Sequence, residues 1–98
     1  MALEPVSIAA EIGKWSGQYE EAQTELSIEQ DNLLIANNEE DAKDPGKKNV
    51  KRLTSIRQKV ARLQIKLGLA KEFLDFWKDR MKDFIQLLKM IAEIASPR

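Results

Sequence analysis

The sequence predicts an all-α protein whose fold is an antiparallel two-helix hairpin, resembling a coiled coil and completed to a four-helix bundle by dimerisation. Apolar residues recur at alternating intervals of three and four along nearly all of residues 1–98, which is the spacing of a helical seam. A Pro-Gly pair at residues 45 and 46 interrupts this pattern. Residues 20–44 carry nine acids and one Lys, whereas residues 47–71 carry nine Lys or Arg and no acid. An acidic helix is therefore expected to fold back on a basic one within a single domain.

The first helix is expected over residues 5–42, because Pro5 suits a first helical position. Gly13 and Gly17 each cost about 1 kcal/mol relative to Ala in a helix interior. A local bend, or a helix that begins only at Gln18, is therefore an alternative. The predicted seam of this helix comprises Ile8, Ile12, Trp15, Tyr19, Ala22, Leu26, Leu33 and Ala36, with Glu29 as a break in it.

The turn is expected at residues 43–47, where Asp44 is a candidate N-cap, Pro45 suits the first helical position and Gly46 is flexible. The acids that end the first helix and the bases that begin the second have the wrong sign for both helix dipoles. Both conflicts are relieved if the two ends lie side by side, which favours an intramolecular hairpin.

The second helix is expected over residues 48–95, with Ser96-Pro97 as its stop. Its seam is predicted at Leu53, Val60, Leu63, Leu67, Ala70, Leu74, Trp77, Met81, Phe84, Leu88, Ile91 and Ala95. A second apolar stripe begins after residue 64 and makes this face wider than one partner helix can cover. That stripe includes Ile65, Leu69, Phe73, Phe76, Leu87, Met90 and Ile94.

The two helices can be aligned because antiparallel helices rise equally per residue. The best alignment pairs acids with bases and also sets Leu26 opposite Ile65 and Trp15 opposite Phe76. Exposed ion pairs contribute only about 0–1 kcal/mol each, so we interpret them as setting the register of the hairpin. The register-setting pairs are Glu20–Lys71, Glu25–Lys66, Glu29–Arg62, Glu39–Arg52, Glu40–Lys51 and Asp44–Lys47.

In this alignment the first helix reaches only Gln86, which leaves residues 87–95 as an apolar overhang of about 14 Å. A small chain with so wide an apolar face is stabilised by association. We expect a homo-oligomer, first a dimer, with the overhang as a site for a protein partner. The candidate interface residues are Leu69, Phe73, Phe76, Trp77, Phe84, Leu87, Leu88, Met90, Ile91 and Ile94.

Several classes of function are disfavoured by composition. The chain has no Cys and no His, which removes thiol nucleophiles, the usual zinc ligands and the commonest general base. We expect no enzymatic activity, no catalytic residue, no cofactor and no metal site. Nucleic-acid binding by residues 47–71 is an alternative, although the acidic block opposes it and no aromatic residue interleaves the bases. Binding to a membrane surface is disfavoured by Asp75, Asp79 and Asp83.

No cleavable secretory signal is visible at the start of the chain, and no apolar run reaches the ~18 residues of a membrane span. A cytoplasmic protein is expected, with export that needs no cleaved signal as an alternative.

Short motifs carry a resemblance to small secretion-linked helical proteins. Trp15-Ser16-Gly17, Asp44-Pro45 and Lys78-Asp79 or Lys82-Asp83 are similar to the needle subunits of type III secretion systems. The WXG100 secreted proteins are similar in length and helix number, but their Trp-x-Gly lies in the inter-helix turn. Either resemblance implies export without a cleaved signal and assembly through the hairpin. We interpret the chain as a non-enzymatic interaction or assembly module, with a secretion-system component as the alternative.

Overall fold

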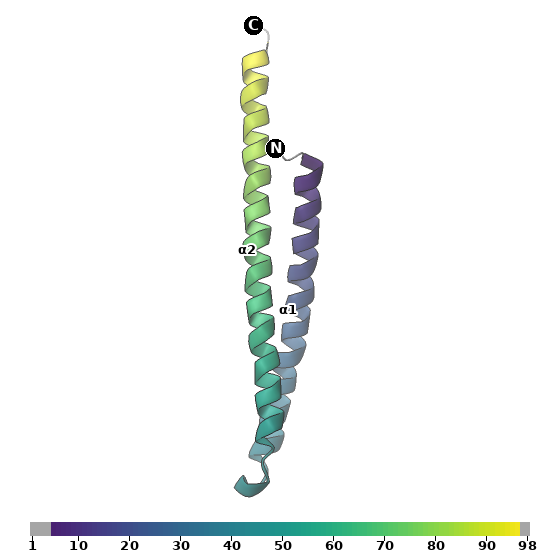
Figure 1. Ribbon diagram of the computed structural model, residues 1–98, viewed down its shortest axis with the longest axis vertical. Coiled ribbons are helices and arrows are strands. Elements are labelled where there is room, and N and C mark those ends of the chain that lie inside the picture. Colours follow the sequence, from purple (N-terminus) through teal and green to yellow (C-terminus); the bar gives the residue numbers. More distant parts are fainter. Residues whose placement is uncertain (1–4, 97–98) are drawn as a thin grey trace.

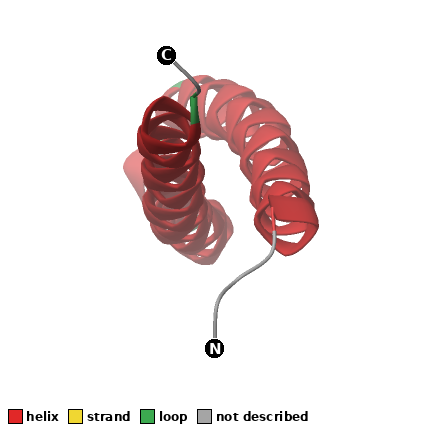
Figure 2. Ribbon diagram, turned by 90° about the horizontal axis from the view of Figure 1, so that it is seen from above, coloured by secondary structure: helices red, strands yellow, loops and turns green. Residues whose placement is uncertain are grey.

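The computed structural model describes residues 5–96 and shows two long helices joined by a short turn (Figure 1). Helix α1 spans Pro5–Asp41, the 3₁₀ turn η1 spans Pro45–Lys47, and helix α2 spans Val50–Ala95. The helices run antiparallel and lie next to one another in both views (Figures 1 and 2). The predicted all-α hairpin is confirmed. Pro97, the expected stop of the second helix, lies outside the described residues.

The ends of the helices differ from the prediction at the turn. Pro45 begins a separate 3₁₀ turn rather than α2, and Asp44 makes no side-chain capping hydrogen bond. The residue that caps α2 is Asn49, whose side chain accepts a hydrogen bond from the backbone N–H of Arg52. α1 is continuous through both of its glycines, so a first helix that begins only at Gln18 is wrong.

Heptad spacing determines which residues are covered. Every seam position of both helices is buried or half-buried as far as Phe84, and the flanking positions are mostly exposed. The seam of α1 also includes Glu40, one heptad step beyond Ala36, and the seam of α2 also includes Ile56. The residues buried most completely are Ile8, Ala22, Leu26, Ala36, Glu40, Val60, Ala70 and Leu74.

The hairpin register differs slightly from the predicted alignment. Trp15 stacks on Phe73, with ring centroids 4.6 Å apart, and not on Phe76. Ile65 is 65% exposed, so it does not cover the buried Leu26. The predicted alignment was set by charged residues at the edges of the interface. Their long side chains reach over about one turn and tolerate an offset that short seam residues do not.

The contact between Glu40 and Asn49 fixes where the hairpin ends. Because both helices rise equally per residue, equal steps from Glu40 back to Pro5 and from Asn49 forward bring Pro5 opposite Phe84. Residues 85–95 of α2 therefore project beyond α1, by about 16 Å at 1.5 Å per residue. Figure 1 shows α2 extending past the start of α1. The expected overhang is present, and Leu88 and Ile91 in it are about half exposed.

The molecule is elongated and has little interior. Its Cα radius of gyration is 22.5 Å, whereas a compact domain of about 100 residues has a value near 13 Å. The principal extents are 83 × 24 × 14 Å. Side chains between two helices are covered from one side only, so the hairpin contains a single narrow seam of buried residues.

Replacing a seam residue should destabilise the hairpin far more than the same replacement outside the seam. Leu26→Ala removes a side chain that is 9% exposed and should lower the free energy of unfolding by about 2 kcal/mol. Leu34→Ala, at a position that is 62% exposed on the same helix, should change it by less than about 0.5 kcal/mol. Urea denaturation followed by far-UV circular dichroism at one fixed protein concentration measures both. Equal losses would contradict the seam.

Candidate interaction site

The turn end of the hairpin contains a buried carboxylate, Glu40, whose residue is only 1% exposed. Its Oε2 accepts a hydrogen bond of 2.8 Å from the backbone N–H of Asn49, and its Oε1 accepts one of 2.8 Å from Lys43 Nζ. Arg52 Nη1 lies 3.4 Å from the same Oε1. Both carboxylate oxygens therefore have partners, as a buried charge requires.

Glu40 also connects the two helices through the cap of α2. In an ordinary capping box, the N-cap side chain accepts from the backbone of the third helical residue, and a Glu at that third position accepts from the N-cap backbone N–H. Here Asn49 Oδ1 accepts from Arg52 N at 3.0 Å, but the third position is Arg52. The carboxylate comes from α1 instead, so the start of α2 is completed by the other helix.

The hydrogen bonds lower the pKa of Glu40 from its ordinary value of 4.5 to about 2. The backbone N–H of Asn49 is the largest cause, followed by the side chain of Lys43. Donors that satisfy the charged form stabilise it. Glu40 is therefore ionised throughout the pH range in which most proteins fold.

The structure brings together some of the expected charge pairs. Arg52 Nη1 lies 2.8 Å from Glu39 Oε2, as aligned from the sequence. Glu40 contacts Arg52 and Lys43 rather than Lys51, because a seam position points it at the start of α2. Within residues 5–96, the other aligned pairs do not approach within 4.0 Å: Glu20–Lys71, Glu25–Lys66, Glu29–Arg62 and Asp44–Lys47.

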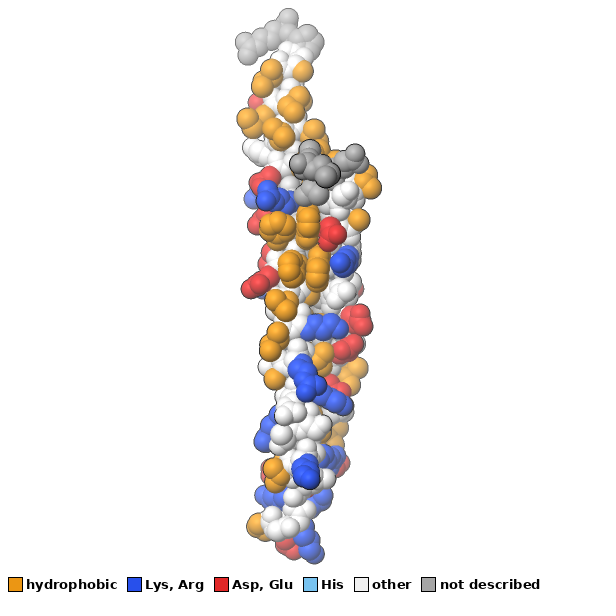
Figure 3. Space-filling model, in the orientation of Figure 1, with side chains coloured by type: hydrophobic (Ala, Val, Ile, Leu, Met, Phe, Trp, Pro, Cys, Tyr) orange, Lys and Arg blue, Asp and Glu red, His pale blue; other side chains and the backbone are white. Residues whose placement is uncertain are grey.

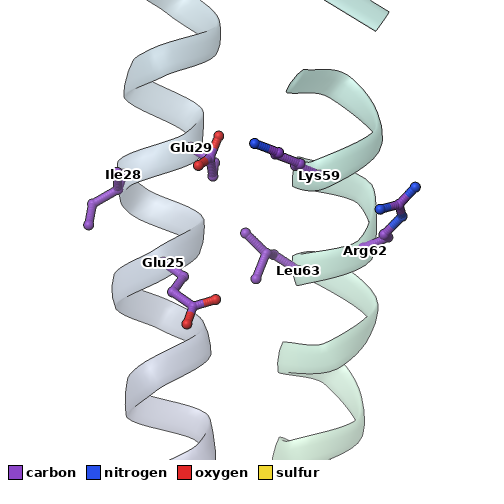
Figure 4. Close-up of a pocket in the computed structure, with 6 residues that line it drawn as sticks. All are labelled: Glu25, Ile28, Glu29, Lys59, Arg62 and Leu63. Atoms are coloured by element: carbon purple, nitrogen blue, oxygen red, sulfur yellow. The ribbon is translucent and has the colours of Figure 1, made fainter. Parts of the chain in front are cut away.

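Midway along the hairpin, a hollow lies between α1 and α2. It is lined by Glu25, Ile28 and Glu29 from α1 and by Lys59, Arg62 and Leu63 from α2. Figure 4 shows Glu29 and Lys59 extending toward one another across the gap, Leu63 pointing into it and Ile28 pointing away. Two acids and two bases line the hollow, so it offers no excess charge for a ligand.

An apolar face on the C-terminal part of α2 is left uncovered by α1. Hydrophobic side chains gather along the upper half of the molecule, and Lys and Arg gather along the lower half (Figure 3). Most of the candidate interface residues lie exposed on this face. Trp77 and Phe84 are half-buried against α1 and belong to the hairpin seam. The exposed members are Ile65, Leu69, Phe73, Phe76, Ile85, Leu87, Leu88, Met90, Ile91 and Ile94.

Aromatic contacts position one edge of this apolar face. The Trp15 ring stacks on Phe73, and its Nε1 donates to Glu11 Oε2 at 3.1 Å. Phe76 meets Trp77 edge to face at 5.1 Å, and the Arg80 guanidinium lies 5.2 Å from the Phe76 ring centroid. Phe73 and Phe76 remain 45% and 47% exposed, so these contacts orient the rings without covering them.

Comparison of the chain with protein families, with curated proteins and with solved structures finds no match in any of the three.

Neither described helix contains an apolar stretch long enough to cross a membrane. Within residues 5–96, no group of three or more acidic side chains is gathered closely enough to hold a metal ion.

Glu40→Gln should make the stability of the hairpin depend less on pH in the acidic range. Because the folded pKa of about 2 lies below 4.5, the ionised carboxylate contributes stability fully above about pH 4.5 and loses it as the pH falls toward 2. The wild type should therefore be more stable than the variant at pH 7, and the difference should shrink between pH 4.5 and pH 2. Thermal melts across this range measure it. A difference that does not vary with pH would refute the proposed role of the charge.

Proposed function

We propose that this protein is a non-enzymatic assembly module that associates with a second copy of itself through the apolar face of α2, giving a four-helix bundle with coiled-coil-like packing. The proposal rests on the amount of surface that the single chain exposes to solvent. The chain exposes 7708 Å², whereas a compact monomer of its mass exposes about 5,700 Å². The excess of about 2,000 Å² is sufficient for a stable interface, since standard interfaces bury about 800 Å² per partner.

The distribution of the exposed surface supports association by packing. Contiguous apolar patches of this kind mark interaction sites in soluble proteins. Along the paired part of α2, the positions beside the seam are mostly charged or polar, as with Arg52, Lys59 and Lys66. Along the overhang they become apolar, as with Ile85 and Leu87. The exposed apolar stripe that begins after residue 64 therefore widens where α1 ends and no longer covers α2.

Catalysis forms no part of the proposal. Enzymes use concave clefts in which several polar groups converge on a substrate. The hollow between the helices brings Glu25 and Glu29 near Lys59 and Arg62, an arrangement of compensating charges. The function proposed here needs only shape and apolar contact.

A second candidate is a secretion-linked subunit of a larger helical assembly. It is supported by the hairpin around a turn that contains Pro45 and by the projection of α2 past α1 at the other end of the molecule. A projecting apolar helix can pack on the next subunit. A closed dimer and an open filament differ in one measurable respect: the mass of a filament continues to grow with concentration.

Light scattering of the full chain at several concentrations should give the mass of two copies that resists dilution. The mass should persist at high salt, because apolar burial is not screened. Leu87→Glu, at a 52% exposed position on the apolar face, should shift the chain toward monomer. Leu34→Glu, 62% exposed on α1, is the matched control and should leave the mass unchanged.

A monomer at every concentration would refute self-assembly, and growth without limit would favour the filament subunit. A chain that stays monomeric but binds DNA, with affinity that falls steeply with salt, would instead favour the nucleic-acid alternative.

A further inference from the structure

The exposed stripe of α2 has a heptad spacing of its own, separate from the seam that faces α1. Starting at Leu69, its positions follow intervals of four and three as far as Ile94. Six of these eight positions are large apolar residues, each at least 45% exposed. The two central positions are Arg80 and Asp83. This spacing is that of a helix that packs along its length on another helix.

When a second copy of this stripe runs in the opposite direction, apolar positions face apolar positions and the basic position faces the acidic one. If a second α2 packs antiparallel about a two-fold axis between Met81 and Lys82, equal rise per residue places each position opposite another member of the stripe. Large apolar residues then meet large apolar residues: Leu69 opposite Ile94, Phe73 opposite Met90, and Phe76 opposite Leu87.

We propose that a second copy of this chain packs on this face, α2 against α2 and antiparallel, with Arg80 of each copy paired with Asp83 of the other. This rests on the proposed self-assembly and specifies its geometry. The Arg80 guanidinium already lies over the Phe76 ring, which places it on the apolar stripe. Within residues 5–96, neither Arg80 nor Asp83 forms an ion pair within 4.0 Å.

Charge determines the direction of packing. Parallel packing would bring Arg80 opposite Arg80 and Asp83 opposite Asp83 in the middle of an apolar stripe. Antiparallel packing turns both contacts into attractive ones, so the two central charges favour one orientation and disfavour the other. The same pairs repeat on both sides of the axis.

The arrangement also accounts for the overhang. Residues 85–95 of one copy lie along the Leu69–Phe76 part of the other copy, where Trp15 stacks on Phe73. The neighbouring seam residues Trp77 and Phe84, half-buried in the single chain, lie beside this new contact. Because α1 begins opposite Phe84, the two α1 helices come level only near the axis, and the overhang of each copy packs on the α1–α2 hairpin of the other. Phe73 there meets the thioether of Met90, a favourable sulfur–aromatic contact.

One contact in this geometry is unfavourable. Glu72 of each copy falls near Glu93 of the other at the edge of the interface. Both side chains are exposed, so solvent screens most of the repulsion. Glu93→Gln is consequently expected to strengthen the dimer slightly.

Charge reversal tests the pairing between copies. Arg80→Asp alone places two like-charged contacts at the axis, as does Asp83→Arg alone, and each should weaken the dimer roughly tenfold or more. An equimolar mixture of the two variants should restore a dimer, because one copy then carries two acids and the other two bases. Ion pairing within one chain cannot produce this rescue. Light scattering gives the masses, and circular dichroism checks that each variant remains helical.

Lys78→Asp is the matched control, because it makes the same charge change two residues away on the other side of α2, and it should leave the dimer intact. Dimers of Arg80→Asp and Asp83→Arg as stable as the wild type would overturn the pairing while leaving self-assembly in place. A mixture that stays monomeric would also overturn it. A monomeric wild type would overturn both proposals.

Spin labels test the geometry without altering the charges at the axis. The chain has no Cys, so single labels at Lys82→Cys and Lys71→Cys are straightforward. Antiparallel packing should give distances between copies of about 10–15 Å at residue 82 and about 30 Å at residue 71. Short distances at both sites would mean parallel packing and would overturn the proposal.

Discussion

The hairpin depends on the Glu40 carboxylate, which lies near the end of α1 and accepts a hydrogen bond from the start of α2. Glu40 belongs to the heptad seam, so burial of Ala36 and its neighbours directs its side chain between the helices. A buried carboxylate must be hydrogen-bonded, and the nearest donors are the backbone N–H of Asn49 and the cations Lys43 and Arg52. The same contacts satisfy an N–H group of a helix N-terminus and set the alignment of every later layer.

Much of the fold was predictable because heptad spacing is a property of the chain itself. The seams, the antiparallel hairpin and the overhang all follow from apolar periodicity and from the change of charge at the turn. The exact register did not follow, because charged residues at the edges of the interface admit several alignments. Asn49 could have been recognised as the cap, since Asn immediately before a helical run is a common N-cap. Asp44 was predicted as the cap instead, because it directly precedes the Pro-Gly pair.

The candidate site was predictable in part. The wide apolar face of α2 is visible in the sequence as more hydrophobic positions than one partner helix can cover. Which of them remain available depends on the hairpin. Trp77 and Phe84 are shared with α1, whereas Phe73 and Phe76 are displayed outward. The sequence already separates this second stripe from the hairpin seam, but only the structure shows how far its large apolar residues remain exposed beside α1.

The hairpin topology also implies an order of events in folding. Residues near the turn are separated by few positions in the chain, so the Glu40–Asn49 contact closes a short loop at small entropic cost. Contacts of Ile8 with α2 close a loop that contains most of the chain. Their entropic cost becomes small only after the contacts nearer the turn have formed. The helices are thus expected to close like a zipper from the turn outward, and the apolar end of α2 is the last part of the hairpin to be ordered. A nascent chain would then expose the apolar end of α2 only after the polar half of the hairpin has folded.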